Sequence, residues 1–139
     1  MAMSIFQLLS LYGLTLLVML PLDIFWLSTA GARLYKQEIG SLLLEKPALR
    51  PAAAFYLLYS LGVVVFAVSP AYRDGPWTTA LVYGALFGLL AYATYDLTNL
   101  ATLRGYTTTI ALVDMAWGTL LTAASALLVY LIATFFHII

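Results

Sequence analysis

The sequence predicts an all-α membrane protein built as a four-transmembrane-helix bundle. Of its 139 residues, 64% are hydrophobic and 9% are charged, and the mean hydropathy is +1.01. Soluble domains are about a quarter charged, and a soluble fold this apolar would expose enough apolar surface to aggregate. Four runs also reach the ~20 apolar residues that a helix needs to cross a ~30 Å hydrocarbon core. We therefore expect a single integral-membrane domain over residues 1–139.

The composition excludes several other classes of protein. There is no cysteine, so disulfides and thiol chemistry are absent from the chain. Six basic residues balance six acidic residues, and no basic patch is available to neutralise a row of phosphates, so nucleic acid is not expected as a partner. The chain has one histidine, His137, far from the acidic residues of the spans. Neither a metal site nor a cofactor is therefore expected. The lipid bilayer is the main partner that the sequence predicts.

Each span is expected to be an α-helix, because backbone groups in lipid must be hydrogen-bonded within the segment. The first is expected to stay in the protein, since no Lys or Arg precedes it as in a signal peptide. Pro70, Gly75 and Pro76 are expected to separate spans two and three. Gly105 is expected to cap the third helix and a threonine at 107, 108 or 109 the fourth. The spans are approximately residues 5–30, 52–71, 77–102 and 107–136.

The connection between spans one and two, "RLYKQEIGSLLLEKPALRP", differs from the short connections that follow. Four bases and two acids alternate there with apolar residues. This pattern favours an amphipathic helix lying at the membrane interface, and an ordinary charged loop is the alternative.

The distribution of Lys and Arg predicts the orientation. Connections one and three hold five of the six basic residues, and the other side holds only Arg73. The positive-inside rule therefore places connections one and three in the cytoplasm and both termini on the outer side.

Three aspartates lie inside the apolar spans, whereas none of the six basic residues does. Asp23 and Asp96 each lie roughly two turns before the cytoplasmic end of their span, and Asp114 lies at a similar depth on a helix running the other way. Charged residues at such depth cost ~2.5–3.5 kcal/mol by insertion scales, and they usually face the bundle and serve a function. We expect the three carboxylates to share one layer.

Each aspartate has a notable residue on the same helix face. Helical i, i+3 spacing pairs Asp23 with Trp26, Asp96 with Asn99 and Asp114 with Trp117. Tyr92 precedes Asp96 by four residues and joins the same stripe. Three carboxylates clustered in a low dielectric cannot all stay ionised, so at least one is expected to be protonated or to hold a cation.

A purely structural interpretation of these aspartates remains open. Asp96 and Asn99 would then hydrogen-bond neighbouring helices, as polar residues do in membrane bundles. Asp23 and Asp114 would pair with Arg33, Arg104 or Lys36 reaching inward from the rim.

Two stripes of small residues indicate close helix packing. Gly84 and Gly88 form one in span three, and Gly118, Thr122 and Ala126 form another in span four. Either stripe is suited to a homo-oligomer interface, but four helices in one chain favour packing within the molecule.

The chain resembles a family of small bacterial membrane proteins catalogued as domain of unknown function 2177. The resemblance rests on "LDIFWL", "YDLTNLATLRGY" and "VDMAWG", and it covers nearly the whole chain. It implies a four-helix protein of the bacterial inner membrane with no established activity. It draws attention to seven residues, which are Asp23, Trp26, Asp96, Asn99, Arg104, Asp114 and Trp117.

Three functions are compatible with the sequence, and whether the protein is an enzyme stays open. The leading hypothesis is an acidic pocket on the cytoplasmic side that binds or transports a proton, a cation or a cationic small molecule. Thr98, Asn99 and Thr102 would add hydrogen bonds. Trp26, Tyr92 and Trp117 would form an aromatic wall. Four helices rarely enclose a full transport path, so a transporter would need to form a homo-oligomer.

The second hypothesis is a non-catalytic assembly partner that uses the small-residue stripes and the interfacial helix as contact surfaces. The third is a membrane enzyme acting on a lipid, with an aspartate as general acid or base and Arg33 or Arg104 holding a head group. No serine, cysteine or histidine dyad supports this third hypothesis.

Overall fold

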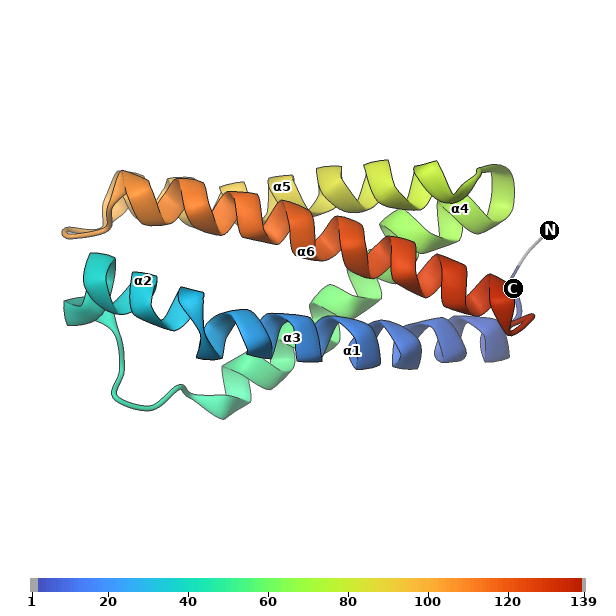
Figure 1. Cartoon of the computed structure of the whole chain (residues 1–139), viewed down its shortest axis with the longest axis horizontal. Helices are drawn as coiled ribbons and strands as arrows, with labels where there is room; N and C mark the ends of the chain where they lie inside the picture. Colours follow the sequence, from blue (N-terminus) through green and yellow to red (C-terminus); the bar gives the residue numbers. More distant parts are fainter. Residues whose placement is uncertain (1–2, 139) are drawn as a thin grey trace.

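The computed structural model describes residues 3–138, which form helices and contain no strand. The helices pack lengthwise in one elongated bundle (Figure 1). They are α1 (Ile5–Ser28), α2 (Ala30–Ile39), α3 (Leu49–Val63), α4 (Ser69–Asp74), α5 (Trp77–Thr102) and α6 (Thr108–Phe135), with a 3₁₀ turn η1 (Gly40–Leu42) and a π-helical segment η2 (Val64–Val68).

Four helical stretches are long and apolar enough to cross a membrane, which confirms the predicted fold class. They are Ile5–Ser28, Leu49–Arg73, Trp77–Thr102 and Thr108–Phe135. At 1.5 Å per residue, the 26 residues of α5 extend ~39 Å, more than a ~30 Å hydrocarbon core requires. The outward side chains suit lipid, since large apolar residues such as Leu17, Leu58 and Leu90 are well exposed on the outer surface.

The second span departs from the expected boundaries. It starts at Leu49 and continues through η2 into α4, so Pro70 lies inside the helical stretch and does not end it. Proline lacks a backbone N–H and disrupts the regular i→i−4 ladder. The π-helical segment η2 lies immediately before α4 and interrupts the regular i→i−4 hydrogen bonds. Pro70 can therefore occupy the first turn of α4 without ending the helical stretch.

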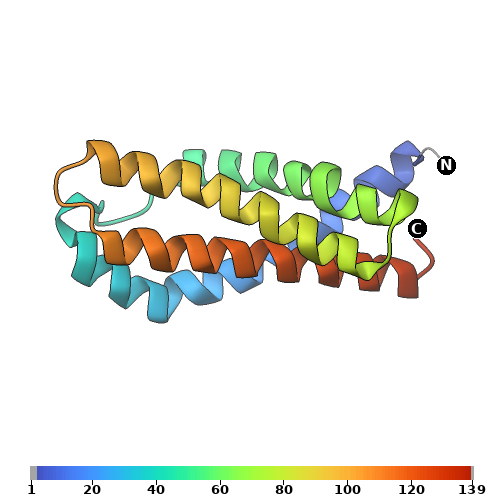
Figure 2. The same cartoon turned by 90° about the horizontal axis from the view of Figure 1, so that it is seen from above.

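The tightest packing is between α5 and α6, which run side by side in both views (Figures 1 and 2). A Cβ atom added at Gly88 would lie 2.4 Å from the carbonyl oxygen of Gly118, and one added at Gly84 would lie 2.9 Å from the Ala126 Cβ. The two small-residue stripes therefore face each other within the molecule. They are not free to form an interface with another chain.

Connections one and three lie at the same end of the bundle, and both termini lie at the other end (Figure 2). A helix follows span one, as expected, but only residues 30–39 form it and residues 43–48 are non-helical. Ile39 of α2 packs there against Tyr106, Ile110 and Ala111 at the start of α6. In both views α2 continues roughly along the bundle axis from the end of α1.

The third connection is a tight turn whose capping differs from the prediction. Leu103, with extended backbone, occupies the C-cap of α5, whereas Gly105 lies two residues later with φ of 79°. Glycine is needed there because the left-handed conformation strains other residues. Thr107 caps α6 by accepting a hydrogen bond from the Ile110 N–H at 3.2 Å.

Candidate functional site

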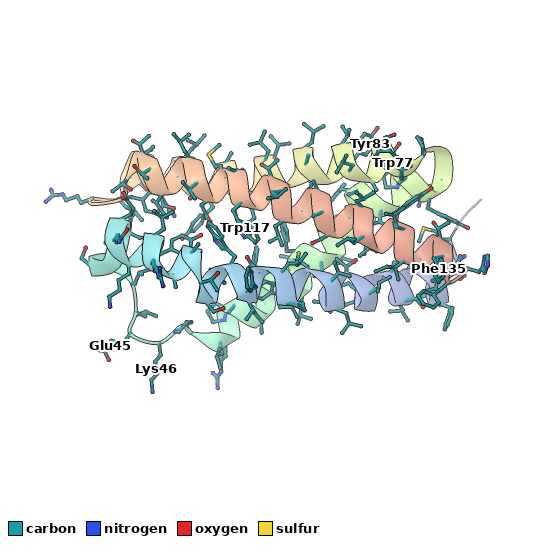
Figure 3. All side chains as sticks on the ribbon, viewed as in Figure 1. Glu45, Lys46, Trp77, Tyr83, Trp117 and Phe135 are labelled. Atoms are coloured by element: carbon teal, nitrogen blue, oxygen red, sulfur yellow. The ribbon has the colours of Figure 1, made fainter. Side chains whose placement is uncertain are left out.

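Asp23 is buried at the junction of three helices. Its Oδ2 accepts a hydrogen bond from the Tyr56 hydroxyl of α3 at 2.5 Å, and its Oδ1 accepts one from the Trp117 indole N–H of α6 at 2.9 Å. The Trp117 ring stacks on Trp26 with centroids 4.7 Å apart. Figure 3 shows Trp117 extending from α6 into the interior of the bundle. One carboxylate of α1 thus binds side chains from both α3 and α6.

Asp96 and Asp114 form a second group, between α5 and α6. The two carboxyl groups are close enough for each to affect the ionisation of the other. Tyr106 donates its hydroxyl to Asp96 Oδ1 at 2.5 Å, and Tyr35 of α2 donates to Asp114. The other Asp96 oxygen is buried and meets no donor among the described residues. Two like charges this close cannot both be ionised without a counterion, so we expect the pair to hold a proton or a cation.

The donors to these three carboxylates are phenol and indole groups, not basic side chains. All six Lys and Arg side chains are exposed, and Arg33, Lys36 and Arg104 do not supply the partners that the structural interpretation assigned to them. A hydroxyl or indole N–H stabilises a carboxylate by hydrogen bonding but contributes no full positive charge. The negative charge of the layer is therefore left uncompensated by the protein's own cations.

The two tyrosines outside the spans remain protonated and act as donors. Burial, with Asp114 close by, raises the pKa of Tyr35 far above its ordinary range. Burial and the hydrogen bond to Asp96 raise the pKa of Tyr106 in the same direction. Both phenols thus keep their O–H at any physiological pH, so the contacts to Asp114 and Asp96 persist.

A cavity of about 460 Å³ opens beside Asp23 and Asp114. Its walls come from α1, α2, α3, α5 and α6, and most of its lining is aromatic. The lining residues are Asp23, Leu27, Tyr35, Ala52, Phe55, Tyr56, Tyr59, Ala91, Tyr92, Tyr95, Asp114 and Trp117. Two carboxylates therefore face a space large enough for a small molecule.

The other residues expected at the site take different places. Trp26 lies behind Trp117, and Asp96 lies behind Asp114, so neither lines the cavity. The Asn99 amide lies beside Tyr106 and Tyr95. Arg33 and Arg104 are exposed and do not line the cavity either.

Thr98 and Thr102, which were expected to add hydrogen bonds to a ligand, do not line the cavity. Both are exposed, and their hydroxyls donate to backbone carbonyls one turn back on α5, those of Thr94 and Thr98. Threonine commonly makes this bond when a helix turns it away from polar partners. Helical position accounts for this placement, since Thr98 lies only two residues from Asp96 and so projects from another face.

The sequence interpretation missed most of the tyrosines. Tyr35, Tyr56, Tyr59, Tyr95 and Tyr106 all contact the carboxylates or line the cavity. The signal was present in the count, because ten tyrosines are many for a chain of this size. Tyrosine is common at membrane interfaces because its ring is amphipathic. Its spacing in the sequence does not distinguish an interfacial tyrosine from a buried one that donates a hydrogen bond.

The three aspartates do not converge as a metal site. Within residues 3–138, no group of three or more His, Cys, Asp or Glu side chains is arranged to hold a metal ion. Asp23 is hydrogen-bonded to Tyr56 and Trp117, whereas Asp96 accepts from Tyr106 and Asp114 from Tyr35. The layer has the geometry of two separate carboxylate centres joined by aromatic side chains.

Comparisons with known proteins agree with this architecture. No curated protein and no solved structure matches the chain. A family model described as "Predicted membrane protein (DUF2177)" matches residues 8–131, which include the three aspartates and most or all of each span. The chain is thus an integral membrane protein that belongs to the DUF2177 family of predicted membrane proteins.

Proposed function

We propose that the cavity binds a small organic cation through Asp23 and Asp114. The observation that carries the proposal is the charge of its lining. Two buried carboxylates border the space, and none of its twelve lining residues is basic. A buried carboxylate without a cationic partner is costly, so a positively charged ligand would stabilise it.

The size of the cavity favours an organic cation over a bare ion. Ligand pockets for small molecules measure roughly 300–1,000 Å³, and this one is about 460 Å³. A metal ion needs several oxygen ligands converging at short distance, whereas within residues 3–138 no group of three or more His, Cys, Asp or Glu side chains is arranged to hold one. An ammonium group could donate to one carboxylate while its carbon skeleton fills the rest.

The aromatic walls suit the same kind of ligand. Tyr59, Tyr92 and Trp117 line the space together with Phe55. Aromatic faces attract cations, and the attraction grows when water is excluded. Such a cage would bind a primary or substituted ammonium group without discriminating strongly between them.

The Asp96–Asp114 pair adds a proton to the chemistry. Asp114 lines the cavity and is also close to Asp96. A cation bound at Asp114 would therefore neutralise the negative charge that the proton shared by the pair otherwise neutralises. We infer that cation binding releases this proton. The proposed activity is thus binding of a cation in exchange for a proton, and transport across the membrane would require the homo-oligomer expected of so small a bundle.

The proposed orientation puts the layer near the cytoplasmic side of a bacterial inner membrane. Asp114 follows Thr108 by six residues, or ~9 Å along the helix. It therefore lies close to the end that carries five of the six basic residues.

The two alternative functions have less support. The small-residue stripes, which an assembly partner would use, pack against each other between α5 and α6. The arginines that would hold a lipid head group for an enzyme lie outside the cavity lining.

Fluorescence titration of the purified protein with butylammonium tests the proposal. Trp77 lies on the outer surface near the start of α5 (Figure 3), so a Trp77→Phe background leaves only the stacked Trp26 and Trp117 to report. We expect saturable changes in emission for this background. Asp23→Asn and Asp114→Asn should each weaken binding at least tenfold.

The matched control is Glu45→Gln, which also removes one acidic group. Glu45 is exposed and extends away from the bundle (Figure 3), so this variant should bind normally. Thermal melting of each variant shows whether it is folded. Equal titration curves for Asp23→Asn, Asp114→Asn and the Trp77→Phe background would refute the proposed function.

A further inference from the structure

A second hollow, of about 510 Å³, lies on the outer side of α3 and η2. Its lining is entirely apolar or aromatic and comes from α3, η2 and α5. The lining residues are Phe55, Leu58, Tyr59, Leu61, Gly62, Val65, Phe66 and Phe87. We refer to it as the tail groove.

The tail groove adjoins the acidic cavity. Phe55 and Tyr59 line both spaces. Their rings stack with centroids 5.1 Å apart, and Tyr59 stacks in turn on Phe87 at 5.2 Å. A molecule bound between Asp23 and Asp114 would thus reach the groove by passing the same two rings.

The groove also opens to the hydrocarbon of the bilayer. Leu58 is 73% exposed, Phe66 58% and Val65 45%, all on one of the four spans. The only polar group in the lining is the Tyr59 hydroxyl, and it is already hydrogen-bonded to the Thr122 hydroxyl at 2.8 Å. A hydrocarbon chain fits such a surface, and a polar chain does not.

We propose that the ligand is an amphiphile with an ammonium head between Asp23 and Asp114 and a single hydrocarbon chain in the tail groove. The argument is charge complementarity at the head and the lining that the two spaces share at Phe55 and Tyr59. The amphiphile enters sideways from the bilayer between α3 and α5. This inference rests on the proposed function, since it assigns the head group to the same cavity.

Photolabelling locates the chain directly. The probe is a primary alkylammonium of twelve carbons with a diazirine at the end of its chain, added to the protein in lipid nanodiscs. The matched probe is the neutral alcohol with the same chain, which enters the bilayer equally but has no charge for the carboxylates. Mass spectrometry of the digested protein identifies the labelled residues.

We expect the ammonium probe to label tail-groove residues, Leu61 and Phe66 among them, at least fivefold more than lipid-facing Leu120 and Leu131. The alcohol should label all of these positions to a similar extent. Excess butylammonium should remove the groove labelling, because it occupies the head site without filling the groove.

A pair of valine variants tests the groove itself. Val65→Phe fills it, while Val82→Phe makes the same change at a comparably exposed position on α5 that lines neither space. Val65→Phe should reduce labelling by the ammonium probe at least fivefold without changing butylammonium binding. Val82→Phe should alter neither.

The outcomes separate this inference from the proposed function. If butylammonium binds but the ammonium probe labels the groove no more than the alcohol does, bilayer lipid alone occupies the groove and the amphiphile proposal is overturned. If butylammonium does not bind at all, the proposed function itself fails.

Discussion

Tyrosine hydroxyls are the main polar partners of the carboxylates in this bundle. A phenol can donate a hydrogen bond to a carboxylate and still present an apolar ring to its surroundings. Tyr56, Tyr35 and Tyr106 do this for Asp23, Asp114 and Asp96 respectively. Because a phenol neutralises no charge, the layer is hydrogen-bonded and yet remains able to accept a cation.

Removing the Tyr106 hydroxyl should destabilise the fold. Asp96 is fully buried, and the hydrogen bond from Tyr106 is the one that its Oδ1 accepts. Loss of a hydrogen bond to a charged or proton-sharing group costs about 1.5–3 kcal/mol. Tyr106→Phe should therefore lower the melting temperature in detergent.

Tyr83→Phe is the matched control for Tyr106→Phe, since Tyr83 lies on the outer surface of α5 (Figure 3). It should melt like the unmodified protein. The double variant Tyr106→Phe/Asp96→Asn should recover part of the loss, because an amide N–H can donate to Asp114. Equal melting of Tyr106→Phe and Tyr83→Phe would show that the buried bond contributes nothing.

Proton release on cation binding is expected from the Asp96–Asp114 pair. Calorimetric titration with butylammonium in two buffers of different ionisation enthalpy should give different apparent enthalpies. In Asp96→Asn the shared proton is gone, so binding should persist with an enthalpy independent of the buffer. An unchanged buffer dependence in this variant would place the released proton elsewhere.

Helix packing depends on glycine at the α5–α6 contact. Gly88 lies against backbone of α6, because its added Cβ would approach the Gly118 carbonyl oxygen to 2.4 Å. Backbone cannot move aside as a flexible side chain can. Gly88→Ala should therefore separate the two helices and cost about 1–3 kcal/mol of stability.

Gly13→Ala supplies the comparison on α1. No atom lies within 4 Å of a Cβ added there, and alanine favours a helix over glycine by up to about 1 kcal/mol. Thermal melting should show opposite shifts for the two substitutions. A similar shift for both would mean that close packing at Gly88 is unimportant.

The elements were predictable from the sequence to different degrees. The span of α5 matches its predicted limits, because a long apolar run flanked by Pro76 and Gly105 leaves little freedom. The start of span two was placed too late, since the helix begins at Leu49, before the apolar run, and includes the exposed residues Leu49 and Arg50. The π-helical segment η2 has no recognisable signal in "VVFAV" and could not be anticipated.

The candidate site was predictable only in part, because its side chains come from several helices. Buried aspartates stand out in an apolar helix, and helical spacing gives their depth. Their partners come from other helices, so the crossing of α3 past α1 decides that Tyr56 meets Asp23. Single-helix periodicity carries no information about such crossings, and so the tyrosines and the cavity could not be derived from it.

At the scale of the whole molecule, the orientation in the membrane is still a prediction. The chain has no cysteine, so a single one can be introduced without background. Ser41 lies in connection one and Thr78 at the opposite end, and both are exposed. In spheroplasts, a membrane-impermeant maleimide should label Thr78→Cys and not Ser41→Cys.

Lysis of the spheroplasts before labelling is the control for this experiment, because both cysteines should then react. Labelling of Ser41→Cys in intact spheroplasts, with Thr78→Cys protected, would reverse the orientation. The acidic cavity would then lie near the outer surface of the membrane.

The partners of Asp23 have a consequence for the synthesis of the protein. Tyr56 follows Asp23 by 33 residues and Trp117 by 94, so α1 leaves the ribosome long before either donor exists. Until α6 is inserted, the nascent first span carries a carboxylate without its native partners. We expect truncated chains that end before Trp117 to be held at the insertion machinery or degraded, so that completion of the last helix decides whether the first one stays in the bilayer.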